Sequence, residues 1–103
     1  MSKEYKKFVQ LCSLAIWASA IEGEMPRARL TMQSISSEQR IRLIEEIRIK
    51  LDEVLKKIGK NLGEAVPDKD CAVEAVKTLR GKGDELIEEL QEIHISLLSQ
   101  ENN

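Results

Sequence analysis

The sequence predicts an all-α domain, a three-helix arrangement built around a long antiparallel helical hairpin. Three observations support this class. Apolar residues recur at alternating spacings of three and four over long stretches, which is the pattern of packed helices. The only two prolines, Pro26 and Pro67, fall where helix boundaries are expected. Aromatic residues make up only 3% of the 103 residues, so Leu, Ile, Val and Ala must fill the core of one domain spanning residues 1–103.

The first helix is expected over residues 3–22, with Gly23 ending it. It carries two apolar stripes, which is more apolar width than a helix with one neighbour needs. We therefore expect it to contact two partners. One stripe contains Tyr5, Phe8, Val9, Cys12 and Ile16, and the other contains Leu11, Leu14, Trp17, Ala18 and Ile21.

The same N-terminal stretch has features of a secretory signal, with three lysines, an apolar run and the triplet Ala18-Ser19-Ala20. Gln10, Ser13 and Ser19 dilute the apolar run, so we interpret the stretch as a structural helix. It is also shorter than the roughly 20 apolar residues that span a membrane, and no membrane association is expected.

Residues 23–37 form a connection that is long for a helical bundle. Its apolar residues Leu30, Met32 and Ile35 indicate that it packs over an end of the bundle, with a short helical turn. The second helix then begins after Ser36, because Gln39 three residues later completes a capping box. It should run over 37–62 and stop at Gly63. Its apolar seam contains Ile41, Ile44, Leu51, Leu55, Ile58 and Leu62 together with one charged residue, Arg48.

The third helix is expected over residues 68–99, with Asp68 as its N-cap. Gly81 and Gly83 each cost roughly 1 kcal/mol in a helix interior, but the seam keeps its phase across them. Either the helix continues, or the break is so short that both halves face the same partner. The seam contains Ala72, Val76, Leu79, Gly83, Leu86, Leu90, Ile93 and Leu97.

A short turn makes the two long helices antiparallel neighbours. If the turn is centred between residues 65 and 66, Arg48 lies opposite Gly83, within reach of Asp84 or Glu85. If the helix instead breaks at Arg80-Gly81-Lys82-Gly83, its backbone amides could bind an anion. Arg48, Lys82 and Gly83 are therefore the candidate anion or register site, and an anion- or small-ligand-binding bundle is one alternative function.

The net charge of −2 is unevenly distributed. Residues 40–60 contain seven basic and four acidic residues, which gives +3, whereas residues 84–101 contain six acidic residues and no Lys or Arg. The two charged helices are expected to face each other's flanks. A basic-face nucleic-acid regulator remains a second alternative, although acids interrupt the basic residues and no aromatic residue accompanies them. Its contacts would be Arg40, Arg42, Lys56, Lys57 and Lys60.

No catalytic or metal-binding pattern is present in the sequence. Cys12 and Cys71 form no CxxC pair, and the single histidine, His94, lacks both a ligand partner and the residues that follow a phosphoacceptor histidine. We therefore expect no enzyme activity, no cofactor and no metal. Two unrelated cysteines favour free thiols in a reducing compartment, so a cytoplasmic location is expected.

Surplus apolar width on the first two helices favours a homodimer, which would complete a larger bundle, or another helical protein as partner. The leading interpretation is a small protein–protein interaction module (an adaptor, chaperone or regulator) that acts through helix–helix packing. The candidate interaction residues are Leu11, Leu14, Trp17, Ile21, Ile47 and Val54.

Overall fold

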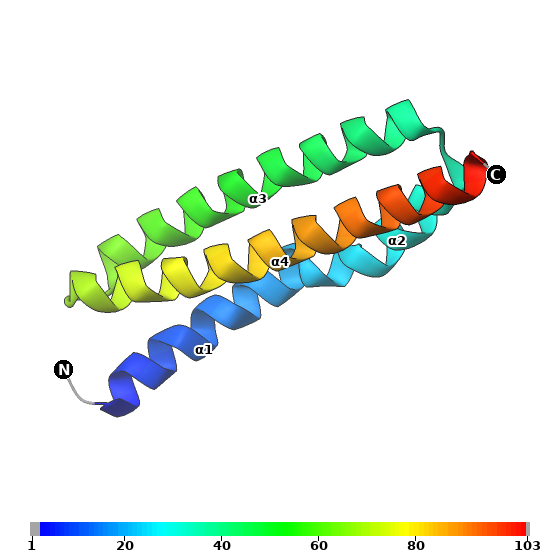
Figure 1. Cartoon of the computed structure of the whole chain (residues 1–103). Coiled ribbons are helices and arrows are strands. Elements are labelled where there is room, and N and C mark those ends of the chain that lie inside the picture. The colour runs from blue at the N-terminus through cyan, green and yellow to red at the C-terminus, as the bar shows by residue number, and fades with distance from the viewer. Residues whose placement is uncertain (1–2, 103) are drawn as a thin grey trace.

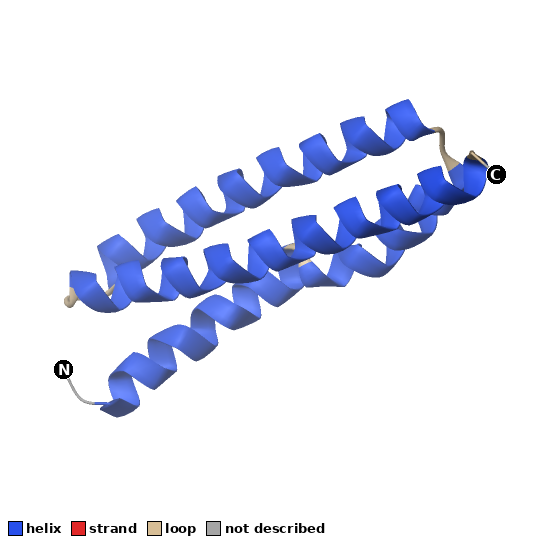
Figure 2. Cartoon of the chain, in the orientation of Figure 1, coloured by secondary structure: helices blue, strands red, loops and turns tan. Residues whose placement is uncertain are grey.

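The computed structural model describes residues 3–102, and every regular element in this range is helical (Figure 2). The elements are α1 (Lys3–Ala20), the short 3-10 helix η1 (Glu22–Glu24), α2 (Met25–Ser34), α3 (Ser37–Ala65) and α4 (Lys69–Glu101). The predicted all-α fold and its long helical hairpin are confirmed.

The helices form an elongated bundle with extents of 57 × 20 × 18 Å. Helices α3 and α4 are the antiparallel arms of the hairpin (Figure 1). Helices α1 and α2 follow one another along α4, with α1 beside its first half and α2 beside its second half, so together they form the third rod of the bundle (Figure 1).

Both predicted N-caps are present. The Ser36 hydroxyl accepts a hydrogen bond from the Gln39 backbone N–H while the Gln39 side chain accepts one from the Ser36 N–H, and Asp68 accepts one from the Asp70 N–H. The predicted end of α3 at Gly63 is wrong, because the helix continues to Ala65. Val66, in extended conformation, precedes Pro67, which disfavours helical geometry at the residue before it.

The connection between the first and second predicted helices contains more helix than expected. It forms α2, a helix of 10 residues with Pro26 in its first turn, where the missing proline N–H leaves no helical hydrogen bond unmade. Arg29 fixes α2 to α4, because its Nε and Nη2 donate to the two carboxylate oxygens of Glu89 at 2.8 and 3.0 Å.

The predicted pairing of Arg48 with Gly83 is wrong. Gly83 faces Leu51 and Trp17, and a Cβ atom built on it would lie 3.6 Å from Leu51 Cδ1 and 3.2 Å from Trp17 Cη2. The Arg48 side chain is exposed and pairs within its own helix, with Nε 3.5 Å from Glu45 Oε2. Because α3 extends past Gly63, the turn lies later in the chain and the facing positions shift accordingly.

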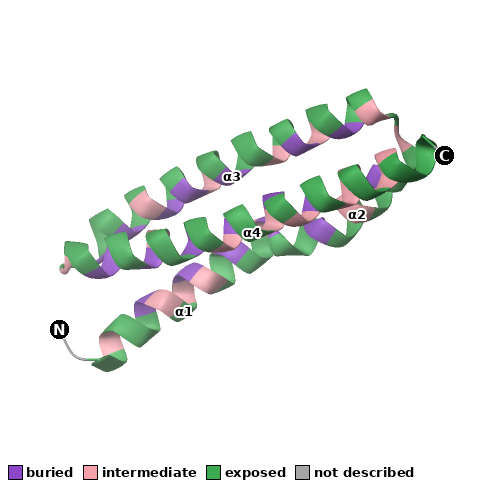
Figure 3. Ribbon diagram, in the orientation of Figure 1, coloured by how far each residue is buried: buried purple, intermediate pink, exposed green. Residues whose placement is uncertain are grey.

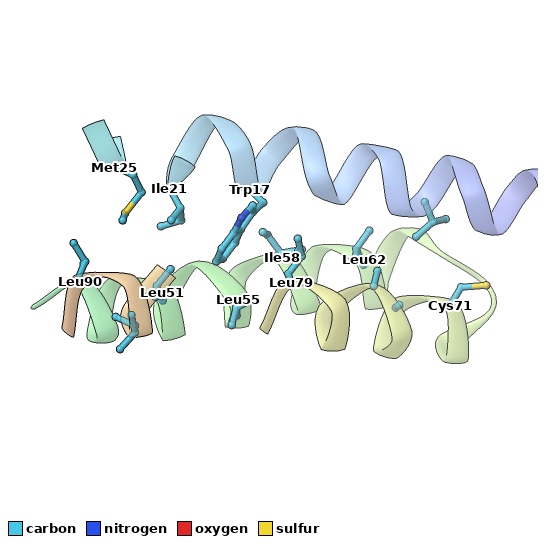
Figure 4. Close-up of a cluster of buried hydrophobic side chains, with 14 of the residues drawn as sticks. Trp17, Ile21, Met25, Leu51, Leu55, Ile58, Leu62, Cys71, Leu79 and Leu90 are labelled. Atoms are coloured by element: carbon cyan, nitrogen blue, oxygen red, sulfur yellow. The ribbon is translucent and has the colours of Figure 1, made fainter. Parts of the chain in front are cut away.

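The core runs along the whole hairpin and is closed by α1 and α2. Trp17 is the largest fully buried side chain, and its ring points from α1 toward the hairpin (Figure 4). Helix α4 is continuous through Gly81 and Gly83. The other core residues include Ile21, Met25, Met32, Ile44, Leu51, Leu55, Ile58, Leu62, Leu79, Ile87 and Leu90.

Candidate interaction surface

The outer face of α1 is an apolar helical surface that the fold leaves open. We define it by five exposed residues, Phe8, Leu11, Ala15, Ala18 and Ser19. Phe8 and Leu11 are each 61% exposed, although side chains of this kind are normally buried. No charged residue occurs between Lys7 and Glu22, so this face lacks the polar cover found on the outer sides of α3 and α4.

The opposite side of α1 explains why this face points outward. Val9, Ser13 and Trp17 are buried at a spacing of four residues, which puts them on one side of α1. The buried side of α1 lies against the hairpin, whereas its outer side is exposed (Figure 3). The Trp17 indole Nε1 donates to Glu22 Oε1 at 3.1 Å at the edge of the core, and the ring covers Gly83. These contacts fix the rotation of α1 and therefore which residues remain outside.

The six predicted interaction residues separate into three groups. Leu11 lies on the outer face of α1. Leu14, Ile47 and Val54 are half-buried and pack against the core. Trp17 and Ile21 are buried within the single chain and do not form part of an exposed surface, which corrects their assignment as interaction residues. The sequence pattern missed the core-facing stripe because one of its members is a serine, Ser13, whose hydroxyl donates to the Gln10 carbonyl at 2.8 Å.

The predicted anion or register site is not assembled. Arg48 pairs with Glu45, Lys82 Nζ lies 3.9 Å from Glu22 Oε1, and Gly83 packs under Trp17. Because α4 remains helical here, its backbone amides bond along the helix and form no anion-binding nest. The three residues therefore do not converge on a ligand.

A separate groove lies between α2 and α3, with a cavity volume of about 310 Å³. Its apolar side chains include Met25, Leu43 and Ile47. Lys50 and Glu24 form an ion pair at the rim, which ties α3 to the segment before α2. The groove exists because the ten-residue α2 packs mainly on α4 and leaves this flank of α3 uncovered.

A charged cluster built around one buried guanidinium joins the start of α3 to the end of α4. The Arg40 side chain is only 1% exposed and donates from Nη1 and Nη2 to the two carboxylate oxygens of Glu101 at 2.9 and 3.0 Å. Its Nε donates to His94 Nδ1 at 3.0 Å, and Nη1 also donates to the Ile35 carbonyl oxygen at 3.1 Å. The Arg40 hydrogen bonds hold the pKa of Glu101 below its usual value.

This cluster was not predicted, since Arg40 was assigned to a basic outer face. Its burial removes it from the candidate nucleic-acid contacts, while Arg42, Lys56, Lys57 and Lys60 stay exposed. A signal existed in part: Arg40 falls one residue after the capping box, where a first-turn side chain can reach the preceding loop. Nothing in the spacing indicated that His94 and Glu101 would meet it.

The two cysteines are free thiols in the structure. Cys71 is buried at the start of α4, and its Sγ lies 3.4 Å from Asp68 Oδ2. Burial and the neighbouring carboxylate raise the pKa of the Cys71 thiol, so it is poorly suited to act as a nucleophile. Among residues 3–102, no three His, Cys, Asp or Glu side chains are grouped to hold a metal ion.

No helix in the described part of the chain is both long and apolar enough to cross a membrane. Comparison with known proteins identifies no relative, since no family model, curated protein or solved structure matches the chain.

Proposed function

We propose that this chain is a small protein–protein interaction module whose docking surface is the outer face of α1. The observation that carries the proposal is the exposure of Phe8 and Leu11 on a helix that has no charged residue from position 8 to position 21. Covering such side chains with a partner removes their apolar surface from water, at about 25 cal/mol per Å².

The chemistry of the face favours a helix as the partner. Phe8, Leu11, Ala15 and Ala18 follow one another at spacings of three, four and three, so they form one straight stripe along α1. A stripe of this kind matches a second apolar helix lying alongside it, as in helix-to-helix recognition generally. Its alanines allow the two backbones to approach closely.

Native mass spectrometry of the purified chain tests this proposal. We expect a species heavier than the 11.7 kDa monomer, containing a second polypeptide, and we expect Leu11→Glu to remove it. A buried, unpaired glutamate is costly, so the loss in affinity should exceed about tenfold. Circular dichroism should show an unchanged helical fold, because Leu11 lies outside the core.

Val73→Glu is the matched control, since Val73 is 66% exposed on α4 and lies outside α1. This variant should form the same complex as the wild type. A wild-type chain that carries no second polypeptide at any accessible concentration would contradict the proposal, as would a complex that survives Leu11→Glu.

A further inference from the structure

We infer that the partner on this face is a second copy of the same chain, with the two α1 helices packed antiparallel about a two-fold axis near Ala15. This inference rests on the docking role proposed for α1. A two-fold interface must be self-complementary, because the same patch is used by both copies. The outer face of α1 meets this condition in both shape and charge.

The shape condition follows from the order of side chains along α1. On the outer face as defined above, the large side chains, Phe8 and Leu11, lie in the first half, and the small ones, Ala15, Ala18 and Ser19, lie in the second half. The second half of α1 also carries Ile16, which is 48% exposed and lies outside this face. In an antiparallel pair centred on Ala15, Leu11 of each copy faces Ser19 of the other, next to Ala18, and Phe8 lies over the end of the partner's α1, near Glu22. At the centre of the pair, Leu11 therefore meets Ser19 and Ala18, and two Ala15 side chains meet each other, which permits close packing.

A parallel pair would fit poorly. It would place Phe8 against Phe8 and Leu11 against Leu11 at one end, and Ala18 against Ala18 at the other. The helices would be held apart where the side chains are large and would leave a gap where they are small. Each gap forfeits van der Waals contact with no compensating gain.

The charges at the two ends of α1 give the same orientation. The first turns carry Lys3, Lys6 and Lys7 against one acid, Glu4, which is a net +2, whereas Glu22 and Glu24 follow the last turn. Lys6 pairs with Glu74 of α4 in the same chain, so Lys3 and Lys7 are the lysines offered to the second copy. An antiparallel pair brings each basic end toward the partner's acidic end and also opposes the two helix dipoles. A parallel pair would bring the lysines together.

The acidic end is free to take part. Glu22 and Glu24 already contact Lys82 and Lys50, but their side chains remain 45% and 60% exposed. Each carboxylate can accept several hydrogen bonds, so a lysine of the second copy can be added to the existing pairs.

Disulfide trapping distinguishes these orientations. In a Cys12→Ser, Cys71→Ala background, Ala15→Cys places one thiol in each copy next to the two-fold axis, within the roughly 7 Å between Cα atoms that a disulfide requires. We expect mild oxidation with a glutathione buffer to shift the band on a non-reducing gel from 11.7 kDa to twice that mass.

Phe8→Cys in the same background is the matched control. With a rise of 1.5 Å per residue, the antiparallel pair separates the two position-8 thiols by about 20 Å, so little product should form. Because Phe8 and Ala15 are both exposed, neither change should disturb the fold of the chain itself.

Each result has a defined meaning. Equal cross-linking at positions 8 and 15 would overturn the antiparallel arrangement and indicate a parallel pair. A complex that depends on Leu11 but cross-links at neither position would overturn self-pairing on this face, while the docking role of α1 would stand. Absence of any complex in the native mass spectrum would overturn both.

Discussion

At the scale of single residues, Gly83 shows how one position links all three rods of the bundle. It lies on α4, and a side chain placed there would meet Trp17 from α1 and Leu51 from α3. The glycine permits a close approach here and is not needed for its backbone freedom, since no glycine in residues 3–102 has a positive φ angle. Its neighbour Gly81 has no such contact.

Replacing Gly83 with leucine should lower the free energy of unfolding by about 1–3 kcal/mol or more, because the larger side chain overpacks the site beneath Trp17. Gly81→Ala is the matched change. A Cβ atom at Gly81 has nothing within 4 Å. The higher helix propensity of alanine should therefore raise the free energy of unfolding of this variant by up to about 1 kcal/mol.

Urea denaturation monitored by circular dichroism measures both variants. If Gly83→Leu were as stable as Gly81→Ala, the close packing of Trp17 over α4 would not describe the protein in solution.

At the scale of elements, features set by residues close together in the sequence could be predicted, whereas contacts between distant residues could not. The caps of α3 and α4 were predictable because Ser36 and Asp68 act on residues two or three positions away. The rotation of α1 was not predictable, because it depends on Trp17 finding space over Gly83, 66 positions later in the chain. The candidate surface was accordingly found only in part, through Leu11.

The Arg40 cluster is a second element-scale feature, since it pins the start of α3 to the last turn of α4 and to the loop at Ile35. A buried guanidinium must be paired to be tolerated, and Glu101 supplies the opposite charge. His94 accepts the remaining Nε–H through Nδ1, so its ring nitrogen is part of the same network.

This cluster predicts a specific acid sensitivity. Because Arg40 lowers the pKa of Glu101 in the folded state, the resulting stability is fully present above the ordinary value of 4.5 and is lost as the pH falls through the lower, folded-state value. Glu101→Gln should therefore be less stable than the wild type at neutral pH, and the difference should narrow in acid.

Thermal melts between neutral and acidic pH measure this difference. Glu88→Gln, on the exposed side of the same helix, is the control for removing one negative charge. If the melting temperatures of Glu101→Gln and the wild type differed by the same amount throughout the acid range, Glu101 would not stabilise the fold through its charge.

At the scale of the whole molecule, the bundle is long and thin, which leaves much of each helix exposed for a chain of 103 residues. The hairpin supplies most of the packing, and the N-terminal rod closes one side of it. The third rod consists of two separate helices, and each leaves a surface open. Helix α1 presents its apolar outer face, and the short α2 leaves the groove between itself and α3.

The position of Trp17 also makes its fluorescence a probe of whether α1 is packed on the hairpin. It is the only tryptophan, and its indole is buried where α1 meets the hairpin. Its fluorescence emission should therefore report the attachment of α1, whereas circular dichroism reports total helix. On gradual denaturation, a red shift in emission that precedes loss of helical signal would identify α1 as the first part to detach. Coincident transitions would instead indicate that the chain unfolds as one cooperative unit.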